Sequence, residues 1–383
     1  MRTIIEGELK FPSICARQNI AINVTEQVGN RSMRAIITLV VVASALSGCS
    51  PYLYQKEVES FNSSITAVSN GVTQGLDNID QDQAATDLAQ VVGARAGVNL
   101  SKGCGGNPDE LCRLMVPPNN TPNISAADKF APGKPETKKA LAALKAYADG
   151  LAAVTNAQDR KDYDAAASQL SSSTAALGTA LGAVTPGGAA AGPALGAAVT
   201  LATWTIGTGL DAARYDTLKS AIDAVGTPSI DSEKGKRSTI EVVVDKAVTP
   251  MLTSVQSARI KLLTDQLNAR MDRINIDLDA RIAIADEKCA KKATCPADIS
   301  LDRYDTPLAD SVSLVASLNA LKGVDPAAVG ESLVQAHNEM MKAVNDKSRQ
   351  FQNLVSAMAD FADKAAAVEK AFAKQPTATA DAK

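Results

Sequence analysis

Apolar residues recur at alternating steps of four and three in two parts of the chain, one near each end. A sustained repeat of 3.5 residues keeps one face of a helix turned toward a supercoiling partner. The first repeat predicts a long helix that begins shortly after residue 50. Its apolar positions are Tyr54, Val58, Phe61, Ile65, Val68, Val72 and Ile79, with Gly75 at the one missing position.

The second repeat predicts one continuous last helix, because Pro326 suits a first turn and Pro376 lies just past the end. His337, the only histidine, falls on this line, and a polar residue there commonly fixes register or partner number. We therefore expect a structural role for His337, with pH sensing and catalysis as alternatives. The line comprises Leu333, His337, Met340, Val344, Lys347, Phe351, Leu354, Met358, Phe361, Ala365, Val368 and Phe372.

Four further helical segments are predicted between these repeats. They cover about residues 137–184 (with a break near Gly150 or Gln158), 188–225, 238–286 (kinked near its start by Pro250) and 307–321. The third carries Leu263, Leu267, Met271, Ile274, Leu278 and Ile282 at helical spacing. No segment has the alternation typical of a β-sheet. The pattern predicts an all-α fold, an elongated antiparallel helical bundle with coiled-coil (heptad) packing over residues 49–374, then a disordered tail at 375–383.

Residues 165–210 contain no charged side chain, and Pro186 divides them into two arms. Each arm has about 20 residues, enough to cross a hydrocarbon core. Glycines spaced four apart allow close helix contact, as in membrane helix pairs. The segment is therefore either a hairpin packed in the bundle, which the hydroxyl residues of its first arm favour, or a membrane-inserting hairpin. Its marker residues are Gly178, Gly182, Pro186, Gly188, Gly192, Gly196 and the single tryptophan, Trp204.

Composition narrows the function classes. Aromatic residues make up 3% of the chain, and the net charge of −3 gives no electrostatic basis for a nucleic-acid partner. Hydrolase, metalloprotease and nucleotide-binding motifs are absent from the sequence. We expect a non-enzymatic protein with no catalytic residues, metal or cofactor; an envelope enzyme of another kind is a lesser alternative.

Cysteine spacing predicts two disulfide-closed loops, Cys104 with Cys112 and Cys289 with Cys295. Other pairings stay open, and zinc is disfavoured because the spacing within each pair is longer than zinc ligands usually show. Asn78, Asp80 and Asp82 are spaced like the start of a calcium loop. They lack its glycine at the sixth place and its glutamate at the twelfth, so calcium is not expected.

A short positive start at Met33-Arg34 and an apolar run at residues 35–45 precede Leu46-Ser47-Gly48-Cys49. The last four residues match [LVI]-[AST]-[GA]-C and resemble the lipobox of bacterial lipoproteins. The resemblance implies a signal peptide at 33–48 and Cys49 as the diacylated first residue of the mature protein. Residues 1–32 would then follow from a start codon assigned too early.

The same resemblance implies a place in the bacterial cell envelope. Ser50 after the lipidated cysteine implies outer-membrane sorting in a Gram-negative host, facing either the periplasm or the cell surface. We expect a lipid-anchored helical scaffold, spacer or protein-binding module, whose partners are the membrane and either an envelope protein or a second copy. The alternative is a membrane-active or pore-forming protein that inserts residues 165–210. The architecture resembles α-helical pore-forming toxins only broadly, in its long helices and uncharged hairpin.

Overall fold

The computed structural model describes residues 54–94, 99–100, 114–115, 134–184, 209–232, 235–290, 302–346 and 351–373. Nearly all of these residues are helical, which confirms the all-α fold class. The α-helices are α2 (Gln55–Ala94), α4 (Lys134–Asn156), α5 (Arg160–Val184), α7 (Leu210–Gly226), α8 (Thr239–Val243), α9 (Thr249–Ala290), α10 (Asp305–Lys322), α11 (Pro326–Asn345) and α12 (Phe351–Phe372).

Two short antiparallel ribbons interrupt the helices. β1 (Asn99–Leu100) pairs with β2 (Leu114–Met115), and β3 (Ile230–Ser232) pairs with β4 (Gly235–Arg237). Strands of two or three residues are too short to produce a readable alternation, so the sequence did not predict them. A 3-10 turn, η5 (Asp302–Tyr304), precedes α10.

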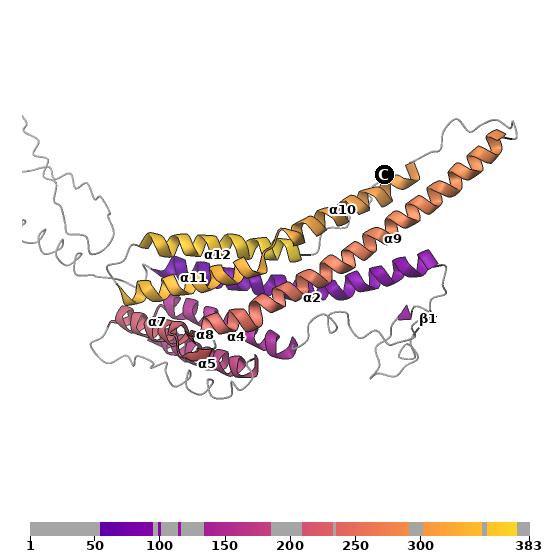
Figure 1. Ribbon diagram of the computed structural model, residues 1–383. Helices are drawn as coiled ribbons and strands as arrows, with labels where there is room; N and C mark the ends of the chain where they lie inside the picture. Colours follow the sequence, from indigo (N-terminus) through magenta and orange to yellow (C-terminus); the bar gives the residue numbers. More distant parts are fainter. Residues whose placement is uncertain are drawn as a thin grey trace, which may run out of the picture.

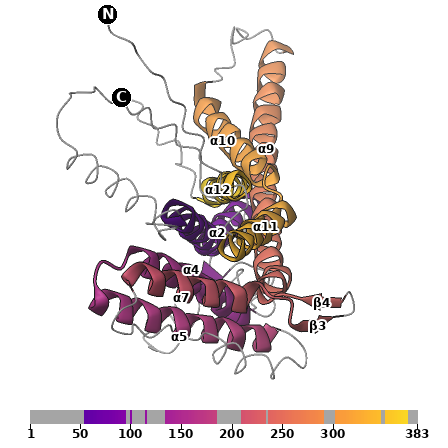
Figure 2. The ribbon, with the colours of Figure 1, turned by 90° about the vertical axis from the view of Figure 1, so that its left-hand side faces the viewer.

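Helix α2 occupies the centre of the molecule, with other helices around it (Figures 1 and 2). The predicted heptad line is confirmed as its buried face, because every apolar member is at most 8% exposed. At its start, the Tyr54 ring lies 5.8 Å from the Phe351 ring. Further along, the Asn78 amide donates to the Phe372 carbonyl over 2.9 Å. Helices α2 and α12 therefore run parallel, so the predicted antiparallel arrangement does not hold for this pair.

Close approach explains the glycine in the α2 heptad line. A Cβ atom added at Gly75 would lie 2.5 Å from Val255 Cγ1 on α9 and 3.1 Å from the Phe372 ring on α12. Real side chains do not tolerate such a contact, so α2 can only touch both helices here because the residue has no Cβ.

The predicted single last helix is wrong. Helix α11 ends at Asn345, Asp346 has extended backbone, and the chain then reverses into α12. The Phe61 ring on α2 lies 6.1 Å from His337 of α11 and 5.9 Å from Phe361 of α12, as expected for an antiparallel pair. The described apolar members of the predicted line remain buried, apart from Phe351, which is 36% exposed. Lys347 lies outside the described residues.

A second layer is formed by α4, α5 and α7 (Figure 2). The predicted break is confirmed at Gln158 and is not at Gly150, since α4 ends at Asn156 and α5 begins at Arg160. The Asp159 carboxylate accepts from the Asp162 backbone N–H over 2.8 Å, which satisfies a donor in the first turn of α5. Of the predicted helix at 188–225, the structure describes only the part in α7.

Helix α9 is preceded by α8 and a π-helical turn, η4 (Val244–Val248). Ser238 and Glu241 form a reciprocal capping box at the start of α8. Pro250 has no backbone N–H to donate, so the hydrogen-bond ladder must be adjusted near it. The π-helical turn lies directly before this proline, where the sequence predicts a kink.

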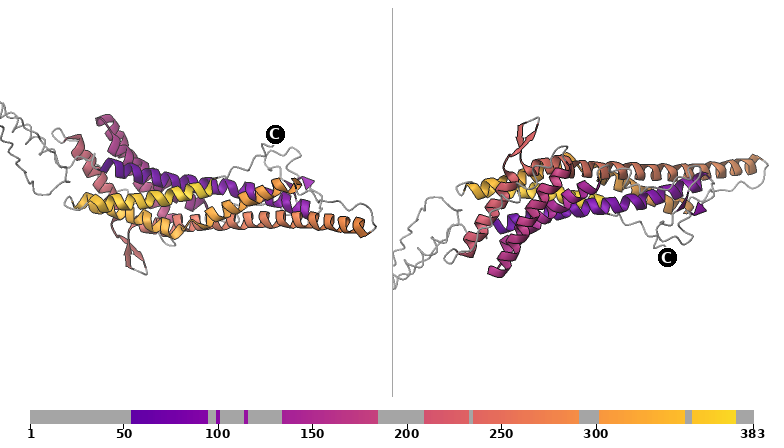
Figure 3. Two further views of the ribbon diagram at one scale, coloured as in Figure 1. Left: turned by 90° about the horizontal axis from the view of Figure 1, so that it is seen from above. Right: turned by 90° about the horizontal axis from the view of Figure 1, so that it is seen from below.

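The half of α9 after Gln266, together with α10, forms an extension that we call the α9–α10 arm (Figures 1 and 3). Its two helices run antiparallel, because Gln256 contacts the α10 end and Asp277 contacts Tyr304. The predicted helical line of α9 becomes exposed along the arm. Leu263 is 4% exposed, whereas Met271 and Ile282 are 37% and 40% exposed.

Candidate functional site

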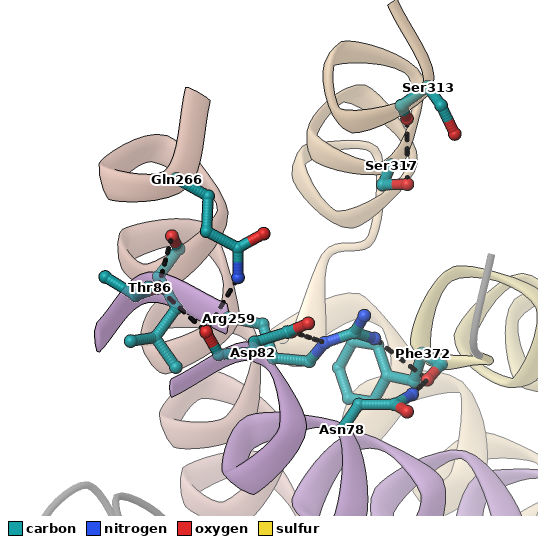
Figure 4. Close-up of polar contacts among 9 residues, drawn as sticks. Asn78, Asp82, Thr86, Arg259, Gln266, Ser313, Ser317 and Phe372 are labelled. Carbon is teal, nitrogen blue, oxygen red and sulfur yellow. Dashed lines mark hydrogen bonds and ion pairs between the residues drawn. The ribbon is translucent and has the colours of Figure 1, made fainter. Parts of the chain in front are cut away.

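A group of buried polar side chains joins α2, α9 and the end of α12 (Figure 4). We call it the Arg259 cluster. It consists of Asn78, Asp82 and Thr86 from α2, Arg259 and Gln266 from α9, and the Phe372 carbonyl of α12. The Arg259 residue is only 3% exposed.

Arg259 links all three helices. Its Nη1 donates to the Phe372 carbonyl over 2.9 Å, and its Nε donates to Asp82 Oδ2 over 3.3 Å. The Asn78 amide donates to the same Phe372 carbonyl, also over 2.9 Å. Carbonyls in the last turn of a helix have no intrahelical partner, and a cation placed there also opposes the negative end of the helix dipole. The cluster therefore caps the C-terminus of α12 against α2 and α9.

The side chains of Gln266 and Thr86 complete the cluster by donating hydrogen bonds to a backbone carbonyl. The Gln266 amide donates to the Asp82 carbonyl over 2.7 Å, and Thr86 Oγ1 lies 2.7 Å from the same carbonyl. On neighbouring α10, Ser317 Oγ donates to the Ser313 carbonyl over 3.0 Å, so this hydroxyl serves its own helix (Figure 4). The arrangement holds helices together and presents no pair of carboxylates for acid–base chemistry.

The sequence did not predict the Arg259 cluster. Asn78 and Asp82 were considered as the start of a calcium loop, but both lie inside the continuous helix α2. Their spacing of four places them on one helical face, which is what the cluster uses. Arg259 lies on the same face of α9 as the buried residues Val255 and Leu262, at helical spacing from both. This position is the only sequence feature that could have pointed to it.

His337 is fully buried between helices, as its place in the heptad line predicts. Its Nε2 is hydrogen-bonded to the Tyr147 hydroxyl of α4, 2.9 Å away. Among the described residues its Nδ1 has no hydrogen-bond partner. Burial lowers the pKa of His337 to about 4, with a smaller opposing effect from Asp223, so the ring is neutral at pH 7. Burial likewise raises the pKa of Tyr147 well above its usual range. A neutral, fully buried pair supports the structural interpretation.

The structure describes part of the predicted uncharged hairpin. Residues 165–184 belong to α5, which packs against α4, and Gly178 is buried in it. Gly182 is half-buried near the helix end. Thr174 is also buried, and its hydroxyl donates to the Leu170 carbonyl over 2.8 Å. The remaining marker residues, Pro186, Gly188, Gly192, Gly196 and Trp204, lie outside the described residues. None of the helices that the structure describes is long and apolar enough to span a bilayer.

Other predicted site residues fall mainly outside the described segments. These are Cys49 with its signal peptide, the leader at 1–32, Cys104, Cys112, Cys295 and the tail at 375–383. Cys289, near the end of α9, is disulfide-bonded, and its pairing stays a prediction. Within the described part of the chain, no group of three His, Cys, Asp or Glu residues could hold a metal ion.

Comparisons with family models, curated proteins and solved structures found no match for this chain.

Proposed function

We propose that this chain is a lipid-anchored protein of the bacterial envelope that acts as a non-enzymatic helical scaffold or protein-binding module. The observation that carries the proposal is the complete lipobox at Leu46-Ser47-Gly48-Cys49, which resembles that of bacterial lipoproteins. Only four residues separate Cys49 from Tyr54, where the described chain starts with a turn leading into α2. An acylated Cys49 would thus tether the central helix almost directly.

The geometry of the helices supports a spacer role. Helix α2 has 40 residues and extends about 60 Å at 1.5 Å per residue. It starts at one end of the molecule, and the α9–α10 arm projects from the other (Figure 3). A tether at the start of α2 would hold the arm away from the lipid surface. The arm is also where exposed apolar side chains are concentrated, as expected of a binding surface.

The anchor is tested by metabolic labelling with a clickable palmitate analogue in a Gram-negative host. We expect label on the wild-type protein and recovery with the outer membrane. Cys49→Ala should lose the label and appear in the soluble fraction, whereas Cys289→Ala should keep both label and location. An unlabelled wild-type protein, or a labelled Cys49→Ala variant, would contradict the proposal. An N-terminal peptide from residues 1–32 in the mature protein would also contradict it.

The charge-free stretch at 165–210 favours a second candidate function, insertion of this segment into a bilayer. It is tested with residues 50–383, which retain every residue that the structure describes, mixed with dye-loaded liposomes. Insertion predicts dye release with a blue shift of Trp204 fluorescence, both abolished by Gly192→Asp. An unchanged spectrum without release would reject this function and leave the scaffold proposal standing.

A further inference from the structure

Helix α10 has an unusual distribution of charge for a helix with an exposed face. Between its first residue, Asp305, and its last, Lys322, the only charged residue is Asp310. Asp310 is turned toward α9, where its carboxylate lies 3.0 Å from Arg270 Nη1. By comparison, the outer face of α12 carries Asp360, Lys364 and Lys370. The central turns of α10 therefore lack the charged outer face that is typical of a surface helix.

Among the residues that the structure describes, only one face of α10 is covered. Ser311, Leu318 and Leu321 are buried against α9 and the bundle. The opposite face is exposed and forms a line at i, i+4 and i+7, made by Leu308 (43% exposed), Val312 (69%) and Val315 (42%). Because residues at this spacing lie above one another, the three side chains form one continuous stripe. Two exposed small residues, Ala309 and Ala316, flank Val312.

The stripe is suited to pairing with itself. In an antiparallel pair of α10 helices centred on Val312, each Val312 meets its counterpart. Leu308 then faces Ala316, and Val315 faces Ala309, so large residues meet small ones. No like charges are opposed along the stripe. Each Asp305 faces the partner's Asn319, one turn from Lys322, so the acidic end of one helix lies beside the basic end of the other. The helix dipoles are also opposed.

We propose that a second copy of this chain covers the exposed face of α10, in a two-fold dimer whose axis passes near Val312. A two-fold interface requires one surface to be complementary to itself, and this stripe meets that requirement. The proposal does not depend on the lipid anchor, so either can fail without the other.

The test is sedimentation equilibrium of residues 50–383, with the variants Val312→Asp and Val355→Asp. Val355, on α12, is 46% exposed and lies outside the stripe, so it serves as the matched control. We expect a dimer for the wild type and for Val355→Asp. Val312→Asp should raise the dimer dissociation constant at least about 100-fold, because two carboxylates would face each other across the axis. Circular dichroism should show the same helix content for all three proteins.

A second measurement needs no disruptive substitution. Since the axis places residue 312 opposite itself, Val312→Cys should form a dimer-specific disulfide under mild oxidation, and Val355→Cys should not. A wild-type protein that is still monomeric at about 100 µM would overturn the proposal, because its self-affinity would be too weak for a specific dimer. The exposed face of α10 would then be left for a different partner. A dimer that Val312→Asp does not weaken, or that Val312→Cys does not crosslink, would overturn it as well.

Discussion

The helices around α2 and the α9–α10 arm share the same kind of periodic sequence but differ in how completely they are covered. The apolar heptad residues of α2 are at most 8% exposed, because α12, α9 and α4 pack around this helix and Phe61 also contacts His337 of α11. The line of α9 is buried at Leu263 and exposed at Met271 and Ile282. The periodicity of a helix thus identifies its apolar face, whereas the number of neighbouring helices decides whether that face is buried.

The largest expected difference between the two regions is the stability lost when a large apolar side chain is shortened to alanine. Phe61 is fully buried between His337 and Phe361, whereas Ile276 on the arm is 67% exposed. Phe61→Ala should lower the free energy of unfolding by about 3–5 kcal/mol, because it leaves a cavity. Ile276→Ala should change it by no more than about 0.5 kcal/mol. Urea denaturation of both variants measures the difference, and equal losses would contradict the distinction between a covered core and an exposed arm.

Acid should destabilise the covered region through His337. Its pKa is about 4 in the folded protein and about 6.5 in the unfolded chain. Between these values the unfolded state binds the proton and the folded state does not, so stability falls as the pH drops from 6.5 to 4. The loss attributable to this residue is about 3 kcal/mol at the acid end.

The measurement for His337 is chemical denaturation at several pH values for the wild type and His337→Gln. The variant retains a polar side chain that does not titrate, so it should lose less stability across the same window. Parallel pH profiles for the two proteins would show that His337 does not titrate as its burial requires.

Two arginines provide a matched comparison of ion pairs. Arg259 is buried and holds Asp82 and the end of α12, whereas Arg270 on the arm pairs with Asp310 while about a third of each side chain is exposed. Arg259→Met should cost about 2–3 kcal/mol, since it leaves the Phe372 carbonyl and Asp82 short of a donor. Arg270→Met should cost about 1 kcal/mol or less. Thermal unfolding distinguishes the two variants. A larger loss of stability for Arg270→Met would contradict the role of Arg259 in capping the C-terminus of α12.

The smallest effect concerns the spacing of helices around α2. Gly75→Ala should cost about 2 kcal/mol, because its Cβ would meet Val255 and Phe372. Gly209, just before α7, has no neighbouring atom within 4 Å of the corresponding position and a backbone φ of −64°. Gly209→Ala should therefore be neutral or slightly stabilising. Denaturant midpoints compare the two, and equal losses would show that the close approach at Gly75 is unimportant.

The sequence predicted the helices better than their arrangement. The apolar periodicity predicted the buried line of α2 and the helix α10. An interruption of that periodicity predicted the break at Gln158. The turn after Asn345 was missed because Val344 and Phe351 are seven residues apart, so the heptad register continues unchanged across a reversal of the chain. Parallel packing of α2 and α12 could not be predicted, since an apolar face does not specify the direction of its partner.

The candidate site was less predictable than the fold. His337 was recognised because a polar residue interrupts an apolar line. The Arg259 cluster was not, because its contacts join residues up to 294 positions apart and are made largely to backbone carbonyls. Every residue has such a carbonyl, so the sequence offers no sign of which ones will be capped.

Because α2 pairs with α12, the first described helix cannot be fully packed until the last one has been synthesised. Helix α2 emerges from the ribosome first among the described helices, and its contacts with Ala343 and Phe372 span 289 and 294 residues. Closing so long a loop is entropically costly and slow, whereas the neighbouring helices α4 and α5 can pair at once. Until the last segment is released, the part of the apolar face of α2 that packs against α12 has no permanent cover. The fold can therefore be completed only after the end of α12 has been synthesised, although local helix pairs such as α4 and α5 can form earlier.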